Sequence, residues 1–199
     1  MTAQNSFKKN DVIELFTVAQ LECNKLVEET SEKIKSAQSE DEIKALQVVV
    51  KKYKTKAKYI NRILQSETIA DAVALAIVRF KTTREQLSSI IQDSYSLDKL
   101  SALMLCIVQK RVVESKDEHA LSEYIALTVQ GVNDVTYDQL RLKMTTTKKT
   151  PYVDTRQAQM VAKLLQRLNA VKFLKNGSQI VVHFDHESAL SKAIMKAYE

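Results

Sequence analysis

The residues of this chain best suited to recognition chemistry lie along one short segment, residues 154–169. The polar positions of this segment carry hydrogen-bonding or positively charged side chains, namely Thr155, Arg156, Gln157, Gln159, Lys163 and Arg167. Arginine can form two parallel hydrogen bonds to the edge of guanine, and glutamine can do the same to adenine. These residue types therefore suit contact with the bases of a nucleic acid.

An amphipathic helix is the element predicted to position these side chains. The apolar residues between them recur at helical spacing and form a packing face of Met160, Val161, Leu164, Leu165 and Leu168. Asp154 and Gln157 have the spacing of a capping box, in which each side chain satisfies a backbone amide of the first turn. We expect the helix to begin near Asp154 and to end near Asn169.

A basic loop precedes this helix. Residues 145–153, TTTKKTPYV, hold the only proline of the chain and two adjacent lysines, Lys148 and Lys149. Thr136 and Gln139 form another capping box and predict a short helix over 137–144 before the loop. We expect the two lysines to meet phosphate groups, because such contacts dominate affinity for nucleic acids.

A two-stranded hairpin follows the helix. Residues 171–174 and 179–184 are strand-like runs around Asn176-Gly177, a dipeptide that favours tight hairpin turns. Lys172 and Lys175 lie in this hairpin and are further candidates for phosphate contact.

In this order the elements resemble the winged helix-turn-helix superfamily, including the small domains that end some phage and plasmid replication proteins. "VTYDQLRLKM" resembles its second helix, "DTRQAQMVAKLLQRLN" its recognition helix and "AVKFLKNGSQIVVHF" its wing. The resemblance covers residues 135–185, about a quarter of the chain. It implies binding to duplex DNA in transcriptional regulation or as a replication accessory factor of phage or plasmid type. The nine-residue connection is longer than the usual three or four, which shifts the expected phosphate contacts to the loop and the hairpin.

A rival hypothesis stays open. Helical layers followed by a terminal winged helix also resemble the PCI subunits of large eukaryotic assemblies, where that domain packs against protein. The chain would then be an interaction or scaffold subunit without nucleic acid. Acidic groups that neutralise residues 148–175, or an element that covers the polar face of 154–167, would favour this rival.

The first two thirds of the chain predict helices. Residues 11–37 and 39–65 each show helical periodicity and are separated by a capping box at Ser39 and Glu42, which indicates a coiled-coil-like helical hairpin over 1–65. By itself such a hairpin buries only one stripe, so we expect it to pack on the body of the protein or on a second copy. It would then mediate homo-oligomerisation or bind a protein partner. Residues 66–130 predict a bundle of shorter helices, with starts marked by Thr68–Asp71, Thr82–Glu85, Ser96 and Ser115–Glu118.

Gly131, one of two glycines, is placed as a helix C-cap. We therefore predict a domain boundary near 130–134, a winged-helix domain over 131–199 and a closing helix over 186–198. The expected fold class is mainly α, with a helical hairpin and bundle followed by a winged helix that holds a small β-hairpin. The low content of glycine and proline, two and one, agrees with helices joined by short turns.

Charge is concentrated in the C-terminal part. Residues 1–130 hold 19 Lys/Arg and 18 Asp/Glu, whereas residues 131–199 hold 11 and 6, a net charge of +5. A basic terminal domain on a near-neutral body suits phosphate binding.

A second basic run, residues 51–62, contains Lys51, Lys54 and Lys58 on one helical face. It could follow a phosphate backbone, but we expect a solvated face beside an acidic helix that carries Glu22, Glu28, Glu29 and Glu32.

Catalysis, metal and membrane are not expected. The chain lacks the glycine-rich phosphate loops and the nucleophile elbow of known enzymes, so we expect neither an enzyme nor a cofactor. His183, Asp185 and His186 form one short cluster, which is weak evidence for a metal site. Cys23 and Cys106 lie in apolar helical patterns and are expected to be reduced core residues. With no secretory signal and no apolar run of 18 residues, we expect a cytoplasmic protein, or a nuclear one if eukaryotic.

Overall fold

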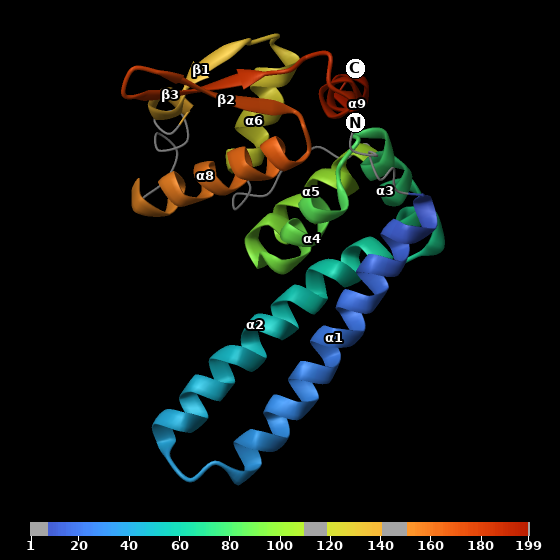
Figure 1. Ribbon diagram of the computed structural model, residues 1–199, viewed down its shortest axis with the longest axis vertical. Helices are drawn as coiled ribbons and strands as arrows, with labels where there is room; N and C mark the ends of the chain where they lie inside the picture. The colour runs from blue at the N-terminus through green and yellow to red at the C-terminus, as the bar shows by residue number, and fades with distance from the viewer. Residues whose placement is uncertain (1–7, 110–118, 141–150, 199) are drawn as a thin grey trace, which may run out of the picture.

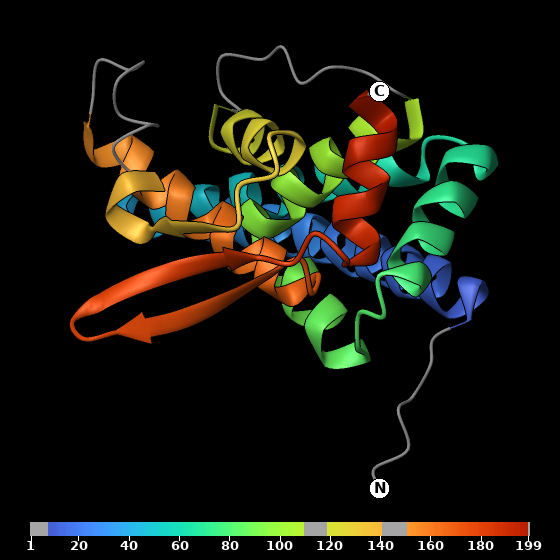
Figure 2. The same cartoon turned by 90° about the horizontal axis from the view of Figure 1, so that it is seen from above.

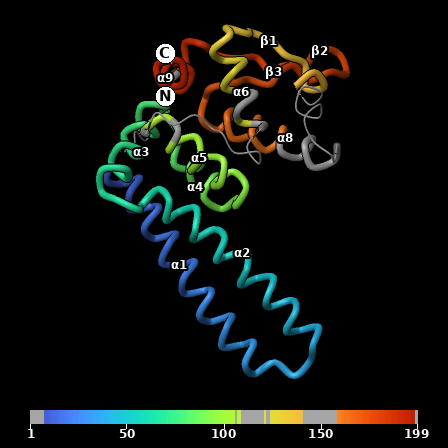
Figure 3. The backbone as a smooth tube through the Cα atoms, turned by 180° about the vertical axis from the view of Figure 1, so that it is seen from behind, coloured from blue at the N-terminus to red at the C-terminus, as the bar shows by residue number. Residues whose placement is uncertain are grey.

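The protein is mainly helical, with one small antiparallel sheet. The computed structural model describes residues 8–109, 119–140 and 151–198 (Figure 1). Elements keep the labels of Figure 1 throughout. A long pair of helices, here called the arm, projects from a compact group of the other elements, here called the head (Figures 1 and 3).

The arm consists of α1, Lys9–Ser36, and α2, Glu40–Leu64, packed antiparallel against each other. Both helices agree with the prediction to within two residues. The Ser39 hydroxyl accepts a hydrogen bond from the Glu42 amide at 3.2 Å and so caps α2 as expected. Near the head the two helices bury Phe16, Cys23 and Ile60. The arm is therefore anchored in the core at its base and is more exposed toward its tip.

The first helices of the head are α3, Glu67–Arg79, and α4, Arg84–Gln92, followed by α5, Ser94–Gln109, and α6, His119–Val129.

The predicted starts of α3 and α4 were wrong by one or two residues. Ser66, not Thr68, caps α3, through a bond from the Ile69 amide at 3.3 Å. The carboxylate of Asp71, the presumed partner of Thr68, instead binds Lys9 Nζ at 2.7 Å. Thr82 is buried, and α4 has its capping box one residue later than predicted, at Thr83 and Gln86.

The predicted start of α5 was also wrong, because a different residue caps it. Asp93 accepts hydrogen bonds from the Tyr95 amide at 3.2 Å and from Ser96 Oγ at 2.7 Å, so Ser96 lies inside the helix and donates. The box expected at Ser115–Glu118 lies outside the described residues. Where several hydroxyl and carboxyl side chains are adjacent, local spacing does not decide which of them caps.

The C-terminal elements are β1, Asp134–Thr136, then α8, Pro151–Arg167, β2, Val171–Asn176, β3, Gln179–Phe184, and α9, Ala189–Tyr198. The strands form an antiparallel sheet in the order β1-β3-β2. The first strand was not predicted, since three residues are too few for alternation to be recognised. Residues 137–140, which follow it, are helical, and Thr136 and Gln139 exchange the two predicted capping bonds, each 3.1 Å.

The two glycines serve chain reversals. Gly131, with φ +71°, follows α6 and donates its amide to the Thr128 carbonyl, as a C-cap does. In the β2–β3 hairpin Asn176 pairs with Gln179, so the two-residue turn is Gly177-Ser178 and not the predicted Asn176-Gly177. Gly177 has φ +60° at the first turn position, the place for glycine in a type II′ turn.

Helix α8 begins three residues before the predicted start at Asp154. Its first residue is Pro151, a residue that the sequence predicts to lie in the preceding loop. Proline suits the first position of a helix, because its φ is already helical and its missing amide would have no helical partner there. A proline between two elements can therefore open the second of them.

The sheet and the α4–α5 pair enclose α8 (Figures 1 and 3). Its buried residues form a wide apolar surface of Ala158, Val161, Ala162, Leu164, Leu165 and Leu168. Buried side chains form one continuous cluster from Val12 in the arm to Ile194 in α9. Among the described residues, no helix is both long and apolar enough to cross a membrane.

Tyr124 links α6 to the sheet. Its ring stacks on Phe184 with centroids 5.4 Å apart, and burial raises the pKa of its phenol to about 12. In the unfolded chain the phenol ionises near pH 10. The folded state is therefore penalised as the pH rises through this window, because only the unfolded state can release the proton easily.

We predict that the free energy of unfolding falls between pH 9 and pH 11 by about 1 kcal/mol more in the native chain than in Tyr124→Phe. Urea unfolding at several pH values measures the difference. Tyr95→Phe, at an exposed position, is the control and should follow the native chain. Equal pH dependence of the unfolding free energy in Tyr124→Phe and the native chain would contradict the raised pKa of Tyr124.

Candidate nucleic-acid interface

The solvent-exposed side of α8 is a narrow polar stripe. Gln159, Lys163 and Gln166 are exposed, and their spacing of four and three residues places them on one line along the helix. In the described part of the chain Lys163 has no ion-pair partner. Gln166 was not among the predicted site residues, although its position three residues after Lys163 indicates the same face. The stripe offers one positive charge flanked by two amides.

Arg167, at the edge of this stripe, is engaged within the protein. Its Nη1 donates to Ser96 Oγ at 3.1 Å and lies 3.7 Å from Asp93 Oδ2. The arginine side chain is 29% exposed. The guanidinium therefore connects the end of α8 to the α4–α5 junction, and its charge is partly balanced there.

Asn169 holds the chain just after α8. Its φ of +57° is left-handed, a conformation that asparagine tolerates better than most residues. Its Nδ2 donates to the carbonyls of Phe80 and Lys81 at 3.1 and 3.2 Å, and its Oδ1 accepts from Gln86 Nε2 at 3.4 Å. The end of α8 is thus hydrogen-bonded to the α3–α4 connection.

The hairpin presents its two lysines on opposite faces. Side chains alternate along a strand, so Val171, Phe173 and Lys175 share one face. Val171 is buried and β2 contacts α8, which identifies this face as the inner one. Lys175 pairs with Ile180 near the turn, where the hairpin projects beyond the head (Figure 2). Lys175 therefore lies at an exposed tip, on the side of the hairpin that faces α8.

Lys172 lies on the outer face of the sheet. Its cross-strand neighbour His183 is paired in turn with Asp134 of β1. The Nδ1 of His183 donates to Asp134 Oδ1 at 2.8 Å, and the Asp134 side chain is 57% exposed. Lys172 thus shares its face with an exposed carboxylate, whereas no described acidic residue shares the inner face with Lys175.

Five of the predicted contact residues cannot be placed in this interface. Lys148 and Lys149 lie outside the described residues. The backbone of Thr155, Arg156 and Gln157 belongs to the first turns of α8, but their side chains are also outside what the structure describes. The described part of the candidate interface therefore consists of the α8 stripe and the hairpin.

The described side chains form no metal-binding cluster, and the one described cysteine side chain, Cys23, is buried. No group of three or more histidine, cysteine or acidic side chains among them is arranged to hold a metal. The Nε2 of His186 donates to the Val132 carbonyl at 2.8 Å, away from a shared site with His183. Cys23 is buried, and burial raises the pKa of its thiol, which lowers the fraction of reactive thiolate.

Comparison of the chain with protein-family models, with curated proteins and with solved structures finds no match.

We predict that Asn169→Ala destabilises the protein by about 2–3 kcal/mol, because it loses three hydrogen bonds and forces alanine into a left-handed conformation. Asn169→Gly loses the same bonds but tolerates that backbone, so its cost should be about 1–2 kcal/mol. Chemical denaturation of both variants measures the difference. Equal stability of the two would show that the backbone conformation at this position contributes nothing.

Proposed function

We propose that this protein binds duplex DNA through a winged helix formed by residues 135–185. The order of elements supports the proposal: β1, the helical residues 137–140, α8 and the β2–β3 hairpin, with β1 beside β3. In this arrangement α8 corresponds to the recognition helix and the hairpin to the wing.

One observation carries the proposal. The exposed stripe of α8 is polar and includes the positive charge of Lys163, and the hairpin beside it projects with Lys175 on its inner face. A duplex resting on this stripe would place its phosphates near the projecting tip. Phosphate contacts would then fix the position of the helix, and the amides of Gln159 and Gln166 would lie toward the groove.

The remaining predicted contacts complete the proposed footprint. Thr155, Arg156 and Gln157 belong to the N-terminal end of α8, the end from which recognition helices reach base edges. Lys148 and Lys149 precede it and would bind phosphates. We assign Arg167 a structural part, since it is already bonded to Ser96 and Asp93. Replacement of Arg167 would weaken the attachment of α8 to the α4–α5 junction, and this effect would precede any change in contact with DNA.

Protein association is the second part of the proposal. Val18 and Leu21 of α1 are 45% and 63% exposed on neighbouring turns of the arm. Large apolar side chains at such spacing suit helix-to-helix contact. The arm would thus serve oligomerisation or a protein partner, while the head binds DNA, as in a transcriptional regulator or replication accessory factor of phage or plasmid type.

The alternative function is that of a scaffold subunit whose winged helix docks protein. Leu174 and Ile180 of the hairpin, 48% and 44% exposed, favour this alternative, because exposed apolar residues at a projecting tip suit a protein surface. The two functions differ in salt dependence, since only contact with phosphates releases counterions.

We predict that the full chain binds a mixed-sequence duplex with an affinity that falls steeply as salt rises. Lys163→Gln and Lys175→Gln should each weaken binding several-fold and reduce the salt slope by about 1. Lys172→Gln should have a smaller effect, because Asp134 already offsets the charge on that face. Fluorescence anisotropy across a salt series measures all three.

Lys196→Gln is the matched control, since it removes one exposed charge from α9. Duplex binding that is absent at low salt would refute DNA binding and favour the scaffold subunit. Equal losses for Lys172→Gln, Lys175→Gln and the control would refute the assignment of the inner face.

A further inference from the structure

A cleft separates the arm from the head. It has a volume of about 490 Å³ and lies where α2 meets the junction of α4 and α5. Its α2 wall includes Val48, Lys51, Lys52 and Tyr59, and its other wall includes Asp93 and Tyr95. We call it the corner cleft. Its volume falls in the range of pockets that hold one small organic molecule.

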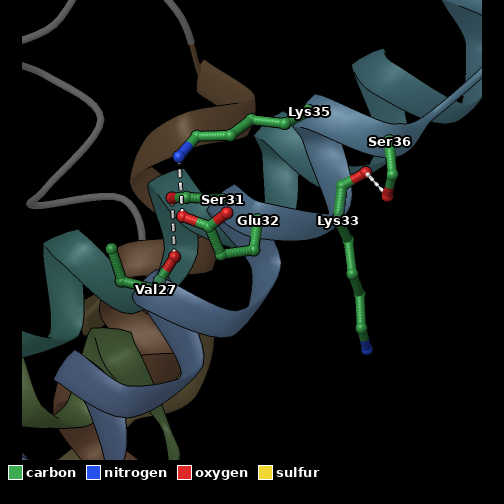
Figure 4. A network of polar contacts seen from close by, with 6 residues as sticks. All are labelled: Val27, Ser31, Glu32, Lys33, Lys35 and Ser36. Atoms are coloured by element: carbon green, nitrogen blue, oxygen red, sulfur yellow. Dashed lines mark hydrogen bonds and ion pairs between the residues drawn. The ribbon is translucent and has the colours of Figure 1, made fainter.

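The α2 wall is strongly basic. Residues 44–64 contain seven lysines and arginines and no acidic residue. The basic run is solvated and lies beside α1, as expected, since Lys51, Lys54 and Lys58 are exposed and α1 packs against α2. Two acidic residues of α1 form ion pairs within their own helix: Glu29 pairs with Lys25. Glu32 pairs with Lys35, as Figure 4 shows. Across these two fully described helices, no ion pair joins an acid of α1 to a lysine of α2. Lys51 and Lys52 therefore bring uncompensated positive charge to the cleft.

The single carboxylate of the opposite wall is already engaged. Asp93 lies 3.7 Å from Arg167 and accepts hydrogen bonds from Ser96 Oγ and the Tyr95 amide. These partners offset its charge and hold it in place. An anion in the cleft would therefore meet two lysines on one side and, on the other, a carboxylate whose charge Arg167 partly offsets.

The corner cleft also has exposed apolar surface beside its lysines. The Tyr95 side chain is 52% exposed at the cleft, and Val48 opposite it is 68% exposed. Tyr59 lies deeper, with Arg62 5.3 Å from its ring centroid. Proteins bind single-stranded nucleic acids with two features: aromatic rings that stack on the bases, and positive charges that contact the phosphate backbone. The corner cleft has both.

We propose that the corner cleft binds an unpaired nucleotide of a single-stranded nucleic acid, with the phosphate at Lys51 and Lys52 and the base against the Tyr95 ring. A duplex does not fit, because its stacked bases present no free face to the tyrosine. The inference concerns a different surface from the proposed function and shares with it only the class of ligand. Together the two surfaces would suit DNA where a duplex opens.

The test uses the full chain with two fluorescent probes, a 12-nucleotide oligothymidine for the cleft and a mixed-sequence duplex for the head. Lys51→Gln/Lys52→Gln should weaken oligothymidine binding about tenfold or more and reduce its salt slope by about 1.4. Tyr95→Ala should weaken it about tenfold, whereas Tyr95→Phe should retain affinity, because stacking needs the ring and not the hydroxyl. Lys35→Gln/Lys44→Gln, which removes two lysines paired elsewhere on the arm, is the matched control.

A second measurement requires no variant. Irradiation of an oligothymidine that carries 5-bromouracil should crosslink the oligonucleotide to the peptide that contains Tyr95. Mass spectrometry of the digested complex identifies the crosslinked peptide. If oligothymidine fails to bind at low salt, if Lys51→Gln/Lys52→Gln behaves like the control, or if the crosslink maps elsewhere, the inference is refuted. A failure of the proposed function gives a different result. In that case duplex binding is absent, or it no longer depends on Lys163 and Lys175, while oligothymidine binding persists.

Discussion

The burial of α8 on two opposite sides is the constraint on which the rest of the structure depends. Leu164, Leu165 and Leu168 are all nearly inaccessible, because the sheet packs on one side and α4–α5 on the other. Each such leucine contributes about 1.5–3 kcal/mol relative to its exposed state. From Ala158 onward, where its side chains are described, a helix held in this way exposes only a narrow stripe to solvent. It also fixes the β2–β3 hairpin relative to the α4–α5 junction, and through that junction relative to the arm.

The polar contacts at the end of α8 determine the position and orientation of the helix within this packing. Apolar burial alone is non-directional, but Asn169 bonds to the carbonyls of Phe80 and Lys81, and Arg167 meets Asp93 and Ser96. These contacts define where α8 ends and how it rests on the helices below. One of them, the pair of Arg167 and Asp93, also partly offsets the charge of the one carboxylate that lines the corner cleft.

Periodicity predicted the long elements well, because apolar residues that repeat at one spacing over many positions must share one face of a regular element. The arm, α8 and the hairpin strands were found within a few residues of their predicted bounds. Helix caps and short elements were predicted less accurately. Ser66 caps α3 in place of Thr68, and β1 is too short for its alternation to be recognised. Contacts between distant residues could not be predicted at all. Arg167 had the sequence context of a surface arginine, and only the fold brings Asp93 to it.

Chemical footprinting of lysines in the presence of duplex DNA tests the central claim most directly. Acetylation followed by mass spectrometry reports each lysine of the full chain separately. We predict that a duplex protects Lys163 of α8 and Lys175 of the hairpin, while Lys192 and Lys196 of α9 react as in the free protein. Unchanged reactivity of Lys163 and Lys175 at a duplex concentration that saturates binding would contradict it.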